Sequence, residues 1–201
     1  MLLHQLLADI RLILASGSPR RRQLLAEAGL QFTTADKYAC DETCPADIPA
    51  DGVAAYLSQL KSRAYPHAPA PGQIIITADT VVTVDGTILG KPAGRADALR
   101  MLGLLSGRTH RVITGVTLRS ADLTSTFSDV TDVTFRTLTD EERAYYVDTF
   151  RPYDKAGAYG IQEWIGYTAV TRIEGSFHNV MGLPVQRLCD ELAMFAVRMQ
   201  R

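Results

Sequence analysis

The start of the chain places three guanidinium groups beside a turn of small polar residues. The segment reads Ala15-Ser16-Gly17-Ser18-Pro19-Arg20-Arg21-Arg22 and follows an apolar stretch. Pro19 suits the first turn of a helix, and Ser18 can cap that helix with its hydroxyl group. Free N–H groups at a helix start, together with the hydroxyl of Ser16 and the arginines, favour an anion. The pattern predicts a phosphate site, although the arginines could instead form a solvated helix face.

Carboxylates occur at two further places where chemistry is expected. Asp79 follows the apolar run 74–78, and Asp41 and Glu42 are adjacent in the polar loop 37–50. Open α/β sheets bind ligands at the carboxyl ends of their strands, which makes Asp79 a catalytic candidate. The alternative for Asp79 is a turn residue that bonds to the hairpin backbone. The loop pair can ligate a metal ion or simply be solvated.

Two lysines and an amide complete the set of candidate groups. In Gly90-Lys91-Pro92 the proline holds Lys91 in an extended conformation, from which its ammonium can reach a phosphate. The segment 154–162 combines small residues with Lys155 and Gln162. Small residues allow close backbone approach, and the amide can both donate to and accept from one edge of a base. This segment is therefore predicted to read a nucleobase.

The elements that must position these groups alternate along the chain, beginning with a βαβ unit. Turn and capping signals are Gly29, Asp85-Gly86, Gly107 and the capping box from Thr139 to Glu142. Helices are predicted at about 20–28, 51–65, 95–105, 140–149 and after 184, and strands at about 11–15, 32–35, 74–78, 81–89, 108–119, 124–136 and 167–175. Segment 178–184 is predicted to be a loop. Without repeats or linkers, one compact unit of two closely joined lobes is expected.

Composition narrows the class of protein. The chain has 201 residues, 46% of them hydrophobic and 21% charged, which is typical of a globular protein. A net charge of −1 argues against a stable nucleic acid complex. Residues 1–11 are predicted to be a short amphipathic extension, because Asp9 and Arg11 interrupt a signal-like run, and no stretch is long enough for a membrane span. Three cysteines are no disulfide framework, so free thiols and a cytoplasmic location are expected.

Five separated motifs together resemble those of the Maf family of nucleoside triphosphate pyrophosphatases, described as house-cleaning enzymes. These motifs are 15–21, 41–43, 78–82, 90–92 and 154–162. Their order and spacing extend the resemblance from Arg11 to the terminal helix. It implies an α/β fold with a mixed, elongated twisted sheet flanked by helices, in which two closely joined lobes leave a cleft between them. It also implies a single Maf-like domain over residues 1–201 and a homodimer.

The resemblance implies hydrolysis of a nucleoside triphosphate between its α and β phosphates, with Mg²⁺ or Mn²⁺ as cofactor. Asp79 matches the family's proton acceptor, while Arg20, Thr80 and Gln162 match positions that mark substrate specificity. Thr80 and Gln162 fit the branch acting on dTTP and UTP. The sister branch acting on 7-methyl-GTP typically has glutamine after the aspartate and glutamate at the position of Gln162, which suits the donor edge of guanine.

The expected site follows from the motifs and the resemblance together. The catalytic residues are predicted to be Asp79, Glu42, Lys61 and Lys91, with Glu42 and Asp79 holding the metal. The substrate-binding residues are predicted to be Ser16, Ser18, Arg20, Arg21, Thr80, Lys155 and Gln162. The alternatives are a pyrophosphatase for another nucleotide, such as 7-methyl-GTP, canonical CTP or a modified pyrimidine, and a nucleotide-sensing protein linked to septum formation. The retained acids favour an enzyme, because a binding protein needs only the cationic groups. Trp164 departs from the family pattern and can fill the core, meet another subunit or stack on a base.

Overall fold

The computed structural model describes residues 2–200, which divide into two compact units. Unit 1 contains the residues up to Asp79, Thr114–Asp129 and those from Gly182 onward, and unit 2 contains Thr80–Ile113 and Val130–Met181. The strands are β1 (Arg11–Leu14), β2 (Phe32–Thr34), β3 (Gln73–Val84), β4 (Thr87–Leu89), β5 (Thr109–Arg119), β6 (Thr124–Phe135) and β7 (Val170–Glu174). The helices are α1 (Leu3–Leu6), α2 (Pro19–Glu27), α3 (Ala50–Ala64), α4 (Arg95–Leu105), α5 (Asp140–Phe150), α6 (Trp164–Ala169), α7 (Phe177–Met181) and α8 (Val185–Met199), with a 3₁₀ turn η1 at Ala156–Ala158.

The seven strands form a mixed sheet in the order β2-β1-β3-β5-β6-β7, with β4 paired to β3. β1 runs parallel to both β2 and β3, whereas the β3–β4 and β6–β7 pairs are antiparallel. The parallel pairing of β1 with β2 across α2 confirms the predicted βαβ start. The predicted mixed α/β class is confirmed, while the cleft and the single domain over residues 1–201 stay predictions.

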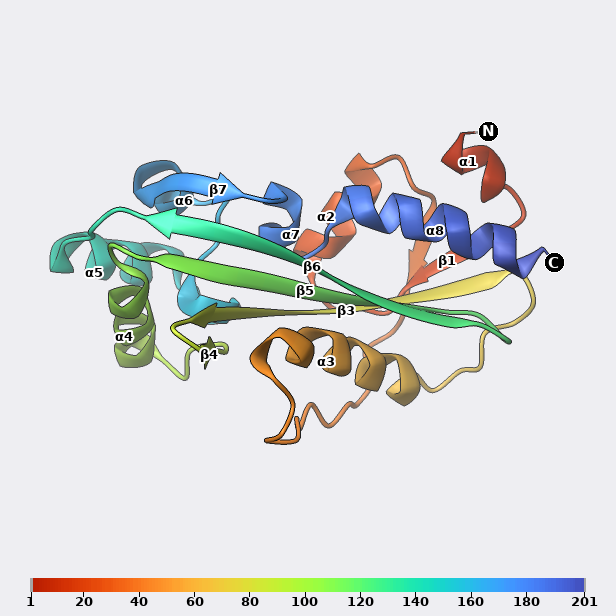
Figure 1. Cartoon of the computed structure of the whole chain (residues 1–201), viewed down its shortest axis with the longest axis horizontal. Helices are drawn as coiled ribbons and strands as arrows, with labels where there is room; N and C mark the ends of the chain where they lie inside the picture. The colour runs from red at the N-terminus through yellow and green to blue at the C-terminus, as the bar shows by residue number, and fades with distance from the viewer. Residues whose placement is uncertain (1, 201) are drawn as a thin grey trace. The chain divides into compact units, whose positions relative to one another are not determined.

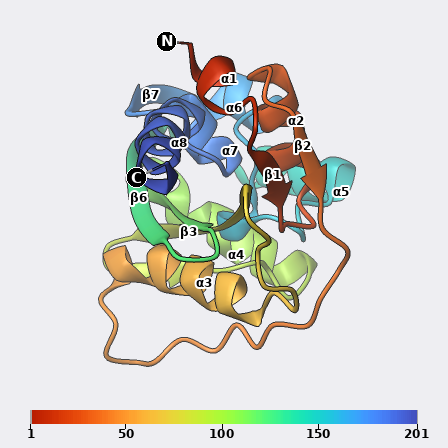
Figure 2. The same cartoon turned by 90° about the vertical axis from the view of Figure 1, so that its right-hand side faces the viewer.

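Unit 1 has a long helix on each face of its strands, α3 on one and α8 on the other (Figure 1 and Figure 2). Ile74, Ile75 and Ile76 of β3 are fully buried, as expected for a strand covered on both faces. Gly115 of β5 lets α3 approach closely, because a Cβ there would stand 2.3 Å from the carbonyl of Ala54.

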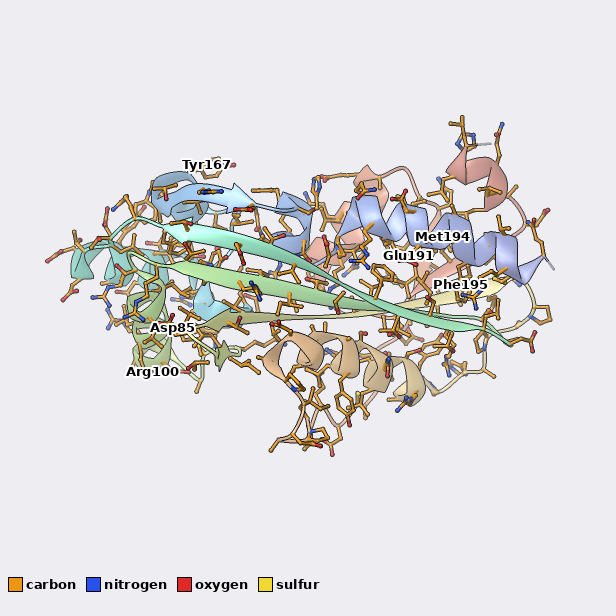
Figure 3. All side chains as sticks on the ribbon, in the orientation of Figure 1. Asp85, Arg100, Tyr167, Glu191, Met194 and Phe195 are labelled. Atoms are coloured by element: carbon orange, nitrogen blue, oxygen red, sulfur yellow. The ribbon has the colours of Figure 1, made fainter. Side chains whose placement is uncertain are left out.

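Helix α8 is amphipathic, which explains its position against the sheet. Leu188, Leu192 and Phe195 are buried, whereas the neighbouring Met194 is 55% exposed (Figure 3). These apolar residues recur at the spacing of one helix face, so burying that face holds the terminal helix in place. No helix within residues 2–200 combines the length and the apolar character needed to cross a membrane.

Unit 2 begins with the hairpin that joins β3 to β4. Asp85 and Gly86 both have positive φ, at 48° and 75°, which is the geometry of the predicted two-residue turn. The capping box of α5 is also confirmed, because Thr139 Oγ1 accepts from the N–H of Glu142 and Glu142 Oε2 accepts from the N–H of Thr139. Helices α4 and α5 pack together over a core that includes Phe135.

Two predicted boundaries near the C-terminal end of unit 2 are wrong. The strand predicted at 167–175 begins only at Val170, and α6 precedes it. Gly166 makes α6 possible, because a Cβ there would overlap the carbonyl oxygen of Ile161. The exposed Tyr167 of α6 is labelled in Figure 3. The short helix α7 overlaps the loop predicted at 178–184, and it has too few residues to show an apolar period.

Candidate active site

The start of α2 has the geometry that the sequence predicts. Pro19 occupies the first helical turn, and the Oγ of the N-cap Ser18 accepts from the N–H of Arg21 at 3.5 Å. The N–H of Ser18 in turn donates to Ser16 Oγ at 3.3 Å. These bonds order the turn before α2, and the positive end of the helix dipole lies at this turn. The helix start therefore fits an anion, while Arg20 is half-buried and Arg22 exposed.

Arg21 makes contacts that the sequence does not predict. Its Nε donates to the carbonyl oxygen of Gly182 at 2.8 Å, and its Nη1 donates to the carbonyl oxygen of Ala78 at 2.8 Å and to Ser16 Oγ at 3.3 Å. Burial lowers the pKa of Arg21, and the carboxylate of Asp79 opposes this effect. The guanidinium therefore joins two backbone carbonyl groups and the hydroxyl of Ser16 within unit 1, and its predicted binding of phosphate stays a prediction.

Lys61 stands between the two candidate acids of unit 1. Its Nζ donates to Asp79 Oδ1 and lies 3.1 Å from Glu42 Oε2. The side chains of Lys61 and Asp79 are only 17% and 13% exposed, whereas that of Glu42 is 49% exposed. Because little water reaches the first two groups, their charges interact more strongly than those of a surface pair. The structure thus brings together three of the four predicted catalytic residues.

The loop that carries Glu42 is fixed by its own contacts. The hydroxyl of Tyr38 donates to the carbonyl oxygen of Lys61 at 3.0 Å, which ties the loop to the end of α3. Asp41 Oδ1 accepts from the N–H and the hydroxyl of Thr43, at 3.1 and 2.6 Å. Asp41 thus stabilises the local turn, while Glu42 reaches Lys61. Both side chains remain exposed, so metal binding by this loop pair stays a prediction.

The donor set of Glu42 and Asp79 suits one class of metal ion. Both carboxylates approach the ammonium of Lys61, so they already share a position that attracts a cation. Within residues 2–200, no three or more His, Cys, Asp or Glu side chains are grouped to hold a metal ion. Mg²⁺ is commonly bound by one or two carboxylates together with water and substrate phosphates rather than by an all-protein cage. The pair fits that mode of binding.

In unit 2, the segment predicted to read a base is attached to the hairpin that precedes Lys91. The N–H of Gly157 donates to the carbonyl oxygen of Gly90 at 3.1 Å. Gly157 has a φ of +68°, and a Cβ there would lie 3.0 to 3.1 Å from the side chain of Val82. Only glycine adopts this positive φ easily and also leaves room for the side chain of Val82. The structure thus brings the Lys91 motif and the 154–162 motif together, with Lys91 itself exposed.

Gln162 carries a buried acceptor that lacks a partner. Its Oε1 is inaccessible to solvent and has no hydrogen-bond donor among residues 2–200. Leaving such a group unpaired costs roughly 1–3 kcal/mol, so proteins rarely keep one without a reason. A ligand N–H group at this position would remove that cost. Thr80, the other predicted specificity residue of unit 2, is half-buried.

Lys155 is held by two carboxylates, one of which the sequence does not predict. Its Nζ lies 2.8 Å from Asp154 Oδ1 and 3.1 Å from Glu163 Oε1, and its side chain is 11% exposed. Glu163 also accepts a hydrogen bond from Tyr146 of α5. The only sequence signal for Glu163 is its place beside Gln162, and Tyr146 gives none, because a buried tyrosine in a helix is ordinary core. Trp164 packs against the core and edge-on to Tyr145, as one of its interpretations predicts.

Residues 11–195 match the family described as Maf-like protein. A dTTP/UTP pyrophosphatase of Bacteroides thetaiotaomicron is 48% identical over 182 residues, covering 90% of this chain and 94% of that protein. A protein with the same description from Porphyromonas gingivalis W83 is 49% identical over 191 residues, covering 94% and 96%. One from Flavobacterium johnsoniae is 41% identical over 191 residues, covering 95% and 98%. A solved HAM1 protein from Coxiella burnetii aligns over 92% of this chain and 99% of its own, but with a TM-score of 0.46 and 13% identity it carries no inference. The match over 11–195 and the identities over most of both chains show that this chain belongs to the Maf-like protein family.

Proposed function

We propose that this chain hydrolyses dTTP and UTP to the nucleoside monophosphate and pyrophosphate. The proposal depends on one observation: the ammonium of Lys61 lies between the carboxylates of Asp79 and Glu42, and Lys61 and Asp79 are largely shielded from water. A carboxylate can accept a proton from a water molecule that attacks phosphorus, and a neighbouring ammonium can stabilise the negative charge that develops on the phosphate oxygens. The relatives described as dTTP/UTP pyrophosphatases support the same reaction.

In the proposed reaction a water molecule attacks the α-phosphorus. A new bond forms from the water oxygen to that phosphorus, and the bond to the bridging oxygen between the α and β phosphates breaks. Pyrophosphate leaves with the electron pair of that bond. Asp79 orients the water and accepts its proton, while the ammonium of Lys61 offsets the charge that develops on the phosphate oxygens. Positioning supplies much of the rate acceleration in such a step.

The remaining cationic groups bind the triphosphate. The N-terminus of α2, with Ser16 and Ser18, accepts phosphate oxygens, and Arg20 supplies a guanidinium to them. Lys91 and Lys155 contribute two ammonium groups. Glu42 and Asp79 would hold Mg²⁺ or Mn²⁺, which when bound neutralises phosphate charge. The contact of Arg21 with phosphate is part of the same proposal.

The base is proposed to be selected by Gln162. Thymine and uracil carry an N–H at position 3 of the ring, which can donate to the unpaired Oε1 of Gln162. Cytosine carries a lone pair on N3 instead. That lone pair would repel Oε1 of Gln162 and leave this acceptor unpaired. A site built to bond one N–H can reject an analogue that lacks it by a large factor. Selection against cytosine nucleotides is therefore part of the proposal, with Thr80 as the second specificity residue.

The test is pyrophosphate release from a panel of dTTP, UTP, dCTP, CTP, GTP and 7-methyl-GTP, with Mg²⁺ or Mn²⁺. We expect dTTP and UTP to be hydrolysed fastest, and Asp79→Asn to abolish release. Asp122→Asn is the matched control, because Asp122 is an exposed carboxylate in the β5–β6 turn. Preference for 7-methyl-GTP would favour the sister activity. Binding of nucleotides without any release would favour the sensing function and overturn the proposal.

The proposal includes a homodimer in the cytoplasm. The three cysteines, Cys40, Cys44 and Cys189, are free thiols, which suits a reducing compartment. Light scattering of the purified chain tests the oligomeric state, and a mass of about 44 kDa, twice the 22.0 kDa of one chain, is expected. A mass of one chain at working concentration would contradict the dimer without affecting the proposed reaction.

A further inference from the structure

A buried tyrosine lies outside the groups assigned to the reaction, yet its hydroxyl bonds to the 154–162 segment and to the residue that directly follows it. Tyr146 of α5 is fully buried. Its hydroxyl donates to Glu163 Oε2 and accepts from the N–H of Gly160 at 3.0 Å. One hydroxyl thus holds a backbone group and a side chain on the two sides of Gln162.

Glu163 extends this network to a cation. Its Oε2 accepts from Tyr146, and its Oε1 lies 3.1 Å from the Nζ of Lys155. The Glu163 side chain is 20% exposed and that of Lys155 is 11% exposed, so the contacts are largely shielded from water. The carboxylate therefore couples the buried tyrosine to the one lysine of the 154–162 segment.

The backbone at Gly160 leaves room for this carboxylate. A Cβ at Gly160 would lie 2.9 Å from the carboxyl carbon of Glu163 and 3.1 Å from both of its oxygens. The glutamate side chain therefore folds back over the glycine. Any side chain at position 160 would displace the flexible end of Glu163 rather than the backbone.

We infer that Tyr146 is a positioning residue for base recognition, which acts through Glu163 and Gly160 to set the orientation of Gln162 and Lys155. The inference rests on the proposed function, because it assigns base reading to Gln162. Burial, and secondarily the hydrogen bond to Glu163, raise the pKa of Tyr146, so its hydroxyl stays protonated and remains a donor. The unpaired Gln162 Oε1 needs a fixed direction to select one N–H, and the network supplies that direction.

A purely structural role for Tyr146 predicts a different result. The ring stacks on Phe150 with centroids 5.1 Å apart, and phenylalanine at position 146 would fill the same space. If the hydroxyl only stabilised the fold, its loss would reduce the fraction of active molecules. Fewer active molecules lower kcat and leave both KM and the preference for dTTP unchanged.

The experiment compares wild type with Tyr146→Phe, measuring kcat and KM for dTTP and for dCTP. We expect KM for dTTP to rise about 10-fold or more and the preference for dTTP over dCTP to fall by a similar factor, with kcat changed less than about 3-fold. Tyr145→Phe is the matched control, because Tyr145 is the next residue of the same helix and is 51% exposed. Its kinetics should equal those of wild type.

Two further variants separate positioning from folding. Gly160→Ala, which displaces Glu163, should reproduce the rise in KM and the loss of preference. In a double-mutant cycle, Tyr146→Phe should add little to Glu163→Gln, because Glu163→Gln already removes the residue through which Tyr146 acts. An unchanged KM and preference in Tyr146→Phe, or fully additive effects with Glu163→Gln, would overturn the inference alone. A wild-type protein that does not hydrolyse dTTP would overturn the proposed function and this inference with it.

Discussion

The guanidinium of Arg21 donates to the carbonyl oxygen of Ala78 at 2.8 Å, and Ala78 directly precedes Asp79. The same guanidinium donates to the carbonyl oxygen of Gly182, which lies far along the chain. One half-buried side chain thus fixes the backbone from which the proposed proton acceptor extends. This relationship gives Arg21 a role in placing Asp79 that does not depend on phosphate binding.

Arg21→Lys should therefore impair both folding and turnover. Lysine keeps the charge but cannot donate in two fixed directions to Gly182 and Ala78. Losing such charge-assisted bonds should cost about 2–3 kcal/mol of unfolding free energy. We expect kcat to fall about 10-fold or more as Asp79 loses its fixed position. Chemical denaturation and steady-state kinetics measure the two effects, with the exposed Arg22→Lys as control. Wild-type stability and kcat in Arg21→Lys would show that the hydrogen bonds of Arg21 to Gly182 and Ala78 are dispensable.

Removing the ammonium between the two acids should slow catalysis. Lys61→Met leaves Asp79 and Glu42 without their shared partner and removes a positive charge from the proposed reaction centre. The loss of one preorganised electrostatic contact typically lowers kcat by about 10²–10³-fold. Lys37→Met is the control, since Lys37 is exposed on the same loop as Glu42. If Lys61→Met retained more than a tenth of the dTTP rate, Lys61 would have no place in the mechanism.

Base selection should change when both specificity residues are exchanged. Gln162→Glu combined with Thr80→Gln replaces the amide by a carboxylate, which cannot donate and which suits the donor edge of guanine. We expect the rate with dTTP to fall about 100-fold and hydrolysis of 7-methyl-GTP to rise. Pyrophosphate release from the two nucleotides measures the exchange. An unchanged preference for dTTP would mean that other residues read the base.

His110 should make the stability of the protein depend on pH. Its ring is 2% exposed, its Nε2 shares a hydrogen bond of 2.7 Å with the hydroxyl of Tyr159, and its Nδ1 has no partner among residues 2–200. Burial lowers the pKa of His110 to about 4, against the opposing carboxylate of Asp132. Between pH 6.5 and 4 the unfolded chain therefore binds the proton that the folded chain excludes, so stability falls as the pH falls.

The size of this effect can be measured by urea denaturation at pH 7.5 and at pH 4.5. The neutral, buried His110 makes its full contribution to the free energy of unfolding above pH 6.5, and on the order of 3 kcal/mol of that free energy is lost by pH 4. His110→Gln should reduce the difference between the two conditions, whereas His178→Gln, at an exposed position, should leave it as in wild type. Equal pH dependence in wild type and His110→Gln would exclude this histidine as the cause.

Local signals in the sequence predict much of the fold. Ser18 and Pro19 start α2, and Asp85 and Gly86 form the hairpin turn, because each residue type has a strong preference for its backbone geometry. The strand predicted at 167–175 fails because α6 depends on a close approach of Gly166 to the carbonyl of Ile161. Such a contact is tertiary and leaves no periodic pattern in the sequence.

In the candidate site, too, some features follow from the sequence and others depend on contacts between distant residues. Glu42 and Lys61 are predicted from a loop motif and the family resemblance, and they lie together with Asp79. The prediction that Asp79 lies at the end of a strand is wrong, because β3 continues through Asp79 to Val84. The contact of Arg21 with Gly182 joins residues 161 positions apart, which no local pattern reveals. The network of Tyr146 and Glu163 is hidden for the same reason, since its bonds form only when α5 packs against the segment that ends at Glu163.

The most direct measurement is the hydrolysis of dTTP in ¹⁸O-labelled water by wild type and by Asp79→Asn. We expect equal amounts of dTMP and pyrophosphate, with the label in dTMP, because water attacks the α-phosphorus. We expect Asp79→Asn to form both products at least about 1,000-fold more slowly while remaining folded by circular dichroism. Label in pyrophosphate, release of dTDP and inorganic phosphate, or a near-normal rate in Asp79→Asn would contradict the proposed reaction.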